Sequence, residues 1–344
     1  MTAAFRIYRS LEEIEAGFGP SALTVGVFDG VHCGHQRILR RVVAMAEKNG
    51  WMPAAVTFDP HPAAVVAPEH APRLMSTPAE RALLMHAAGM VAVVVLPFTE
   101  ELSRLGPEEF VRRILKEGLD ARAVVVGENF RFGRRQAGDT RLLAELGRQY
   151  GFLTEVMPAV RRRGRAVSSS EIRGLIERGE VASAARLLGR PYALEGHVVP
   201  GRGIGSKLTV PTLNLAPSEK VLPATGVYIT RTSAAGHVAG HGPALLWPSV
   251  TNVGYRPSFS GDRLIVETHL LQEPGGAAPR GIRIEFLRRL REERKFPSAE
   301  ELKAQILRDA ARARRHFERL RRQGPGARVI LTTKESRGGS RVSY

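Results

Sequence analysis

Two histidines stand three residues apart in a turn that is rich in small residues. His32 and His35 lie within the segment TVGVFDGVHCGHQ, residues 24–36. A β-like run precedes the pair and a helical pattern follows it, so both side chains fall at a helix start and face the same side. Free N–H groups and the positive dipole end make such a start suited to anions. Two imidazoles there could bind phosphate oxygens and stabilise charge that develops during nucleotidyl transfer.

The histidine pair has two other interpretations. It could be a glycine-rich turn with two incidental surface histidines, because short motifs also match by chance. It could also bind zinc, but the sequence offers no clear third ligand, and a helix start favours phosphate. Both alternatives stay open at this point.

A second group of small and polar residues lies in the later half of the chain. Three glycines in residues 201–205 (GRGIG) make a flexible loop that could wrap a phosphate or form a plain hairpin loop. The segment PTLN follows at residues 211–214. The Thr212 hydroxyl and the Asn214 carbonyl are oxygen ligands of the kind that Mg²⁺ takes, so they are the candidate metal ligands.

The elements that must position these residues differ between the two halves of the chain. The first half alternates apolar β-like runs with amphipathic helical patterns, which is typical of a mostly parallel sheet covered on both faces. Ligands of such sheets bind beyond the carboxyl ends of the strands. We expect strands at 22–28, 54–58, 91–96 and 123–127, and helices at 36–48, 79–88, 107–117, 140–150, 170–178 and 181–188.

From Tyr192 onwards the chain has short β-rich runs separated by glycine and proline, which favours an antiparallel sheet or a small barrel. A closing helix is expected at 299–321, with Ser298 as its N-cap and Glu301 at the capping-box position. The domain boundary is predicted near Gly189. The expected strands are 193–199, 226–230, 244–253, 264–270 and 282–286.

Length and composition place limits on the class of protein. The 344 residues, 43% hydrophobic and 25% charged, suit two globular domains. The one cysteine, Cys33, excludes an internal disulfide framework, and a reduced cytoplasmic setting fits best. No signal peptide or membrane-spanning run is visible. The net charge of +17 suggests anionic partners, although part of the excess is a basic end at residues 311–344 that could be a solvated tail.

Four segments of the first half carry motifs in a fixed order: residues 26–36, TFDPHP at 57–62, VGENFRFG at 126–133 and VSSSEIR at 167–173. Together they resemble the bacterial bifunctional riboflavin kinase/FAD synthetase family, and the histidine turn resembles the H-x-G-H signature of nucleotidylyltransferases. The resemblance implies a catalytic role for His32 and His35. It implies ATP-binding roles for Gly26, Phe28, Asp29, Gly34, Ser168, Ser169, Ser170 and Arg173.

The same resemblance implies a flavin site in the first half. The residues that it assigns to FMN are Phe58, His61, Asn129, Phe130 and Arg131. Ordinary core packing is the alternative for each phenylalanine, and a solvated surface charge is the alternative for Arg131.

Five segments of the second half, PTLN, PATGVY at 223–228, NVGYRPSF at 252–259, VETHL at 266–270 and the passage 286–296, resemble the riboflavin kinase module of that family. The resemblance implies that Glu267 accepts the proton of the riboflavin hydroxyl that attacks ATP; an outward-facing strand glutamate is the alternative. Further kinase-site residues that it implies are Gly201, Gly203, Gly205, Lys207 and Arg294. Ile204 and Thr209 depart from the family pattern, which makes the kinase activity less secure than the adenylyl transfer.

The sequence therefore predicts an α/β Rossmann-like nucleotidylyltransferase domain at 1–188. A small antiparallel β-barrel of the riboflavin kinase type, with a C-terminal helix, is expected at 189–323, and a flexible basic tail at 324–344. The expected substrates are riboflavin, FMN and ATP, with Mg²⁺ as cofactor and no membrane partner. Nucleic acid is disfavoured as a partner, and a weak homo-oligomer stays open. The rival functions are an FMN adenylyltransferase with an impaired kinase half and a basic nucleic-acid-binding protein.

Overall fold

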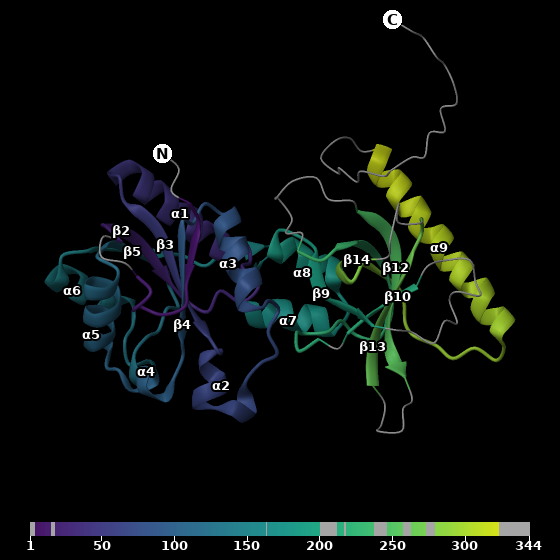
Figure 1. Ribbon diagram of the computed structural model, residues 1–344, viewed down its shortest axis with the longest axis horizontal. Helices are drawn as coiled ribbons and strands as arrows, with labels where there is room; N and C mark the ends of the chain where they lie inside the picture. The colour runs from purple at the N-terminus through teal and green to yellow at the C-terminus, as the bar shows by residue number, and fades with distance from the viewer. Residues whose placement is uncertain are drawn as a thin grey trace, which may run out of the picture. The chain divides into compact units, whose positions relative to one another are not determined.

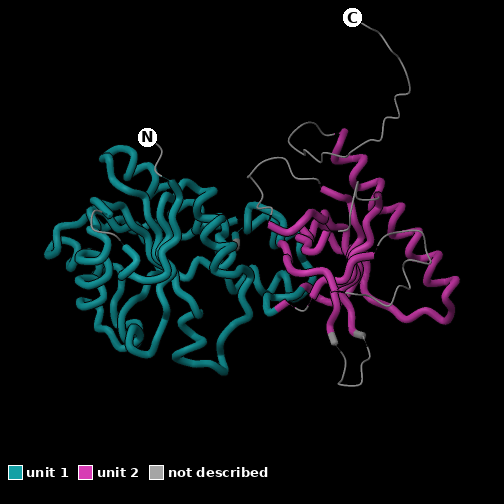
Figure 2. Tube along the Cα trace, in the orientation of Figure 1, with its two compact units in different colours: residues 1–192, 219–222 teal, residues 193–218, 223–344 magenta. Residues whose placement is uncertain are grey.

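The computed structural model describes residues 4–14, 18–162, 164–199, 212–216, 218–236, 246–256, 263–272 and 279–322. The chain divides into two compact units, coloured separately in Figure 2: residues 1–192 with 219–222, and residues 193–218 with 223–344. The domain bounds expected from the sequence stay predictions, and the expected basic tail lies outside the described residues.

The first unit is built on a six-stranded sheet in which every neighbouring pair is parallel (Figure 1). This confirms the Rossmann-like α/β prediction. The edge strands β1 and β6 were not predicted, because β1 has only three residues and β6 exposes apolar side chains. In sheet order the strands are β1 (Arg6–Tyr8), β4 (Ala92–Pro97), β3 (Met52–Asp59), β2 (Ser21–Val25), β5 (Ala121–Gly127) and β6 (Leu153–Met157).

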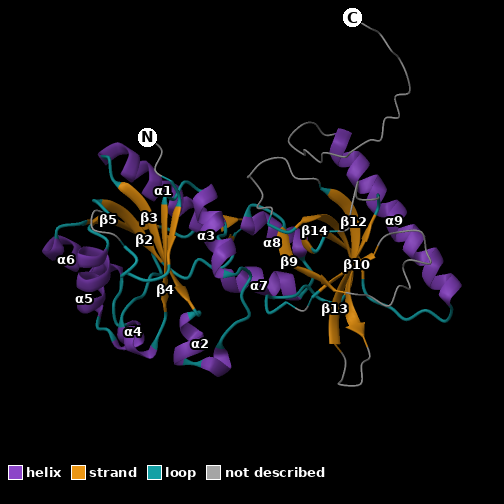
Figure 3. Ribbon diagram, viewed as in Figure 1, coloured by secondary structure: helices purple, strands orange, loops and turns teal. Residues whose placement is uncertain are grey.

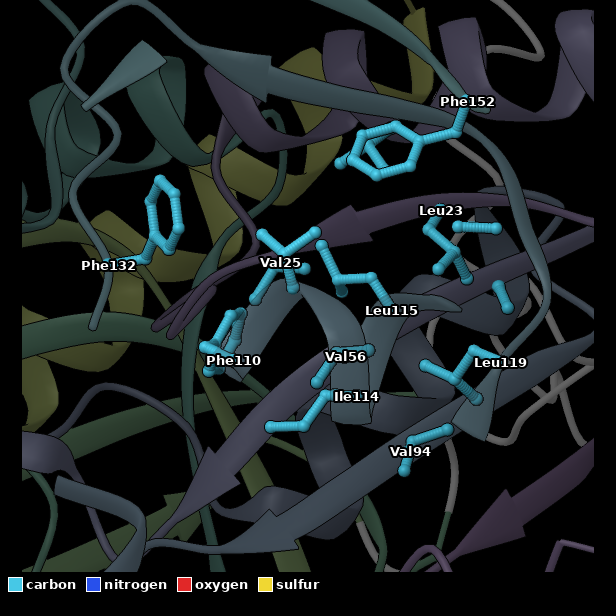
Figure 4. Close-up of a cluster of buried hydrophobic side chains, with 14 of the residues drawn as sticks. Leu23, Val25, Val56, Val94, Phe110, Ile114, Leu115, Leu119, Phe132 and Phe152 are labelled. Atoms are coloured by element: carbon cyan, nitrogen blue, oxygen red, sulfur yellow. The ribbon is translucent and has the colours of Figure 1, made fainter. Parts of the chain in front are cut away.

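Apolar side chains on both faces of this sheet are buried under helices. On one face, Leu23, Val25 and Val56 pack with residues of η2 (Val111–Gly118) and α6 (Thr140–Tyr150), as Figure 4 shows in part. On the other face, strand residues pack with α1 (Cys33–Asn49) and α3 (Pro78–Ala87). Such continuous apolar strands are characteristic of parallel sheets buried on both sides.

The helices begin and end at residues whose chemistry explains the boundaries. Thr77 and Glu80 form a complete capping box at the start of α3, and Gly50 and Gly189 end α1 and α8 in the left-handed conformation. The helix predicted at 107–117 is in fact α5 (Pro107–Phe110) continued by η2, a π-helix. The other short elements are α2 (Pro62–Val66), η1 (Pro68–His70), α4 (Glu100–Arg104), η3 (Arg134–Gln136), β7 (Arg161–Arg162), β8 (Arg165–Ala166), α7 (Ser169–Glu177) and α8 (Val181–Leu188).

The second unit contains a closed antiparallel barrel and a long helix, which confirms the predicted fold class (Figure 3). The helix α9 (Ala299–Arg322) begins as expected, because the Ser298 hydroxyl accepts the Glu301 N–H at 3.2 Å. The barrel strands are β10 (Thr212–Leu215), β13 (Arg263–Leu270), β12 (Trp247–Arg256), β11 (Gly226–Ala234), β14 (Gly281–Arg291) and β9 (Tyr192–Val199).

Alternation along the barrel strands separates hydroxyls from apolar side chains. Five fully or nearly fully buried hydroxyls, from three neighbouring strands, hydrogen-bond to one another. Val227, Ile229 and Val250 lie on the opposite face of their strands and pack against Ala313 and Phe317 of α9. The five hydroxyl residues are Thr230, Thr232, Ser249, Thr251 and Thr268. Among the described residues, no helix is long and apolar enough to cross a membrane.

Candidate active sites

The turn between β2 and α1 is strongly bent. Phe28, Gly30 and Val31 have φ values of 54°, 75° and 38°. Positive φ is strained for phenylalanine and valine, and such strain persists only where the surroundings enforce it. At Gly30 a Cβ atom would stand 2.8 Å from Met75 Cε, so both the conformation and the space call for glycine. The turn is therefore tightly packed before any ligand arrives.

The two histidines lie together at the start of α1. Their rings stack with centroids 3.6 Å apart and an interplanar angle of 17°. His32 is the N-cap residue, and its Nδ1 accepts the His35 N–H at 3.3 Å. Phe28 packs edge-on against His35 with centroids 5.0 Å apart. The pair thus lies at a helix start and shares one side, as predicted, although the helix begins at Cys33 rather than at Gln36.

Burial determines the charge of the two imidazoles. Desolvation, with a smaller contribution from the nearby Arg190 guanidinium, lowers the pKa of His32 to about 4. Desolvation also holds the pKa of His35 well below 6.5, with smaller effects from His32 and Arg190. Both rings are therefore neutral near pH 7. Among the described residues, the buried His35 Nδ1 has no hydrogen-bond partner.

The Asp29 carboxylate connects the turn to two other segments. It accepts the Met75 N–H at 2.9 Å and the Ser76 N–H at 3.1 Å, and it pairs with Arg173 Nη1 at 3.0 Å. Its side chain is only 2% exposed. The Gly30 N–H in turn donates to Ser76 Oγ at 2.9 Å. Asp29 was predicted to bind ATP; its carboxylate oxygens are engaged by the protein, so any effect on ATP would pass through Arg173.

A second helix start, that of α7, adjoins the histidine turn. Ser168 is the N-cap, and its hydroxyl accepts the Glu171 N–H at 3.2 Å. The Ser169 hydroxyl donates to the Asp29 carbonyl at 3.0 Å, and Arg173 Nη2 donates to Ser170 Oγ at 3.3 Å. The structure thus brings together the positive ends of two helices and one arginine, an arrangement suited to a polyphosphate.

Arg81 is a residue that the sequence reasoning missed. It is completely buried, and it donates to the carbonyls of Val27 at 2.7 Å and Phe58 at 3.1 Å and to Thr57 Oγ1 at 3.2 Å. Burial lowers its pKa, while Asp29 and other acidic groups oppose that effect. Arg81 joins the carboxyl ends of β2 and β3, where the candidate ligand groups emerge. The available signal was an arginine on the apolar face of the predicted helix 79–88.

Phe58 lies near the end of β3, and the other predicted flavin residues follow β3 or β5, the two strands that flank β2. Phe58 is buried in the core and packs edge-on against Phe98, and Phe130 is half-buried and stacks on Phe132 at 5.5 Å. His61 caps α2 by accepting the Ala63 N–H, and burial lowers the pKa of its imidazole.

Two other residues of this group lie nearer the surface. Arg131 approaches Asp139 at 3.7 Å, and Asn129 is exposed. The burial of Phe58 and its contact with Phe98 show that this ring has a packing role. The flavin-binding roles of all five residues stay predictions.

In the barrel, the register of three strands gathers the predicted kinase residues. Glu267 of β13 stands opposite Asn214 of β10 on one side and Asn252 of β12 on the other. Thr212 stands opposite His269, and its Oγ1 lies 2.9 Å from His269 Nδ1. Burial lowers the pKa of His269, while the Glu267 carboxylate raises it. His269 was missed, although it lies two residues after Glu267 and so shares its face of the strand.

The remaining kinase-site predictions have different outcomes. Arg294 Nη2 donates to Gln305 Oε1 of α9 at 2.7 Å, and its guanidinium lies 4.8 Å from the Phe296 ring. The glycine loop is not described, so the predictions for Gly201, Gly203, Gly205 and Lys207 lie outside the described residues. Among those residues, no group of three or more His, Cys, Asp or Glu side chains could hold a metal ion.

A Rossmann-like sheet with a histidine turn, followed by a closed barrel, defines a nucleotide-using transferase of two parts. The FAD synthetase family model matches residues 15–171, and the riboflavin kinase family model matches residues 188–317. A curated bifunctional riboflavin kinase/FMN adenylyltransferase from Pseudomonas fluorescens is 35% identical over 90% of this chain and 97% of its own length. The chain therefore belongs to the family of bifunctional riboflavin kinase/FMN adenylyltransferases.

More distant relatives agree with this assignment. The protein of the same name from Bacillus subtilis is 32% identical over 88% of this chain and 94% of its own length. A solved structure from Streptococcus pneumoniae, described as a macrolide-efflux protein, shares the fold with a TM-score of 0.79 and 24% identity. It covers 90% of this chain and 98% of its own. At that identity it is informative about fold alone.

The buried histidines predict a specific dependence on pH. The unfolded chain takes up a proton at His32 near pH 6.5, whereas the folded chain resists until about pH 4. The contribution of neutral His32 to the free energy of unfolding is thus complete above pH 6.5. It falls by on the order of 3 kcal/mol as the pH drops towards 4. Histidine NMR should show an imidazole titrating near pH 4 that disappears in His32→Asn. A midpoint near 6.5 would contradict the burial described here.

Proposed function

We propose that this chain phosphorylates riboflavin with ATP to give FMN, and then joins FMN to the AMP part of ATP, giving FAD and pyrophosphate. The observation that carries the proposal is the presence of two distinct groups of polar and charged side chains in different units. One comprises the histidine pair and Arg173, and the other comprises Glu267 between Asn214 and Asn252. The names of the curated relatives support both reactions.

For adenylyl transfer, the first unit supplies positioning and electrostatic stabilisation. Neutral His32 and His35 donate hydrogen bonds to phosphate oxygens rather than acting as fixed cations, since burial keeps their pKa values low. Arg173, held by Asp29, supplies the fixed positive charge at the start of α7. The FMN phosphate attacks the α-phosphorus of ATP, and pyrophosphate leaves. Charge that develops at phosphorus is stabilised by groups that are already in place.

For phosphorylation, Glu267 acts as general base. Its carboxylate accepts the proton of the riboflavin 5′-hydroxyl as that oxygen attacks the γ-phosphorus of ATP. Thr212 and Asn214 present a hydroxyl and an amide oxygen from one face of β10, a hard-oxygen donor set that fits Mg²⁺. When bound, Mg²⁺ would neutralise charge on the phosphates of ATP. His269, in contact with Thr212, orients that hydroxyl.

The same proposal specifies the partners, the cofactor and the cellular compartment. Riboflavin, FMN and ATP are the partners, and Mg²⁺ is the cofactor. A reducing cytoplasm suits Cys33, which is a free thiol beside the phosphate site.

Reciprocal substitutions in the full chain test whether the two chemistries lie in different units. Glu267→Gln preserves size but removes the base, so FMN formation should fall by about 10²–10⁴-fold. FAD formation from supplied FMN should persist. His35→Asn removes a phosphate ligand and should give the opposite pattern. Separation of riboflavin, FMN and FAD by chromatography measures both rates in one sample.

Each variant is the control for the other, because each keeps the unit that the other alters. Equal loss of both activities in either well-folded variant would contradict separate sites. If the wild-type chain makes FAD from FMN but no FMN from riboflavin, the altered loop at Ile204 and Thr209 has impaired the kinase. In that case an adenylyltransferase with an inactive kinase half becomes the better account.

A further inference from the structure

A four-residue segment from late in the chain belongs to the first unit. Residues 219–222 cluster with residues 1–192, although they lie inside the segment 188–317 that matches the riboflavin kinase family model. The Val221 N–H donates to the Leu74 carbonyl at 2.9 Å, and the Tyr192 hydroxyl donates to the Val221 carbonyl at 2.5 Å. Val221 is 1% exposed, so this segment is an integral part of the unit rather than a surface strand passing over it.

Lys220 of this segment forms a nearly buried ion pair with Glu80 of α3. Its Nζ lies 2.8 Å and 2.9 Å from the two carboxylate oxygens of Glu80, and the side chains are 9% and 17% exposed. The same ammonium lies 5.7 Å from the centroid of the Tyr192 ring. Removal of one partner from such a pair leaves a desolvated charge behind, unlike removal of a surface ion. Lys220 and Glu80 therefore fix each other's positions.

The chain between Leu74 and Glu80 connects this ion pair to the histidine turn. Glu80 accepts the Thr77 N–H at 2.8 Å, while the neighbouring Met75 and Ser76 hold the Asp29 carboxylate through their N–H groups. Leu74, Met75, Ser76 and Thr77 are consecutive, so a shift at either end of this stretch displaces the donors to Asp29. Asp29 in turn holds Arg173.

We propose that Lys220 is a positioning residue for adenylyl transfer to FMN. It acts through residues 74–77 on Asp29, and through Asp29 on Arg173, and it touches no reacting atom. The inference rests on the proposed adenylyltransferase function and extends it. Lys220 lies in the segment that matches the riboflavin kinase family model, yet it supports the candidate site for adenylyl transfer. The adenylyltransferase unit therefore requires sequence from both halves of the chain.

The test is Lys220→Met in the full chain, which removes the charge but keeps most of the side-chain volume. The expected result is a fall in kcat/KM for FAD formation from FMN and ATP of about 10- to 100-fold, the size that a small misplacement of a binding group produces. The KM for ATP should rise, because Arg173 is no longer held against the phosphates. FMN formation from riboflavin should be unchanged.

Two further variants make the result specific. Glu80→Gln removes the other partner, from a position 140 residues away in sequence, and should give the same selective loss with the same rise in KM. Lys116→Met is the matched control. It also removes a lysine from an ion pair of the first unit, with Asp120 at 3.6 Å, and should leave FAD formation unchanged.

The pattern of kinetic constants separates positioning from simple loss of folded protein. Partial unfolding of the first unit lowers the apparent kcat and leaves the KM for ATP unchanged, and that result would overturn the proposal. Unchanged FAD formation in Lys220→Met, or a loss of FMN formation alone, would also overturn it. Absence of FAD formation by the wild-type chain would instead contradict the proposed function on which the inference rests.

Discussion

The Asp29–Arg173 ion pair is the interaction on which the rest of the first unit's site depends. Its carboxylate is almost fully buried, so it requires donors, and the structure supplies two backbone N–H groups and one guanidinium. Through these bonds a single side chain joins the turn after β2, the stretch before α3 and the second turn of α7. These three segments are far apart in sequence. Loss of this carboxylate would leave the partly buried Arg173 without its counter-ion.

The unfavourable features of the first unit are concentrated around the same pair. Phe28 and Val31 adopt positive φ, two imidazoles are buried without charge, and Arg81 is buried while bonded only to carbonyls and a hydroxyl among the described residues. Each of these arrangements costs free energy, and the apolar layers on either side of the sheet offset it. In this candidate site the polar groups are already held in place without a ligand, as electrostatic stabilisation of a transition state requires.

Many helices could be predicted because the residues at their ends determine where they begin and stop. The helices at 140–150 and 181–188 were predicted to the residue, since Asp139 caps one and Gly189 ends the other. The strand β1 was missed because three residues carry too little pattern, and β6 because its apolar side chains are partly exposed. The barrel followed from short β-rich runs, but its order and closure did not, because pairing between strands is not local.

In the candidate sites, too, local motifs could be predicted, whereas contacts between distant parts of the sequence could not. His32, His35, Ser168 and Glu267 could be proposed as site residues because their motifs are contiguous. The support from Met75 and Ser76 was not predictable, because it comes from backbone N–H groups that any residue possesses. The role of Lys220 was equally unpredictable, since its partner Glu80 lies 140 residues away in the sequence. Motifs thus predict which groups would meet a substrate, whereas the residues that hold those groups emerge only from tertiary structure.

The most direct test of this account is Asp29→Asn in the full chain, with both activities measured in the same preparation. The substitution preserves shape, and the amide oxygen can still accept the two backbone N–H groups, but it removes the charge that holds Arg173 and places an NH2 group where the oxygen facing Arg173 stood. The account predicts that FAD formation from FMN falls by on the order of 100-fold, with a raised KM for ATP, while riboflavin phosphorylation continues at the wild-type rate. FAD formation at the wild-type rate and KM would contradict the central role given to this ion pair.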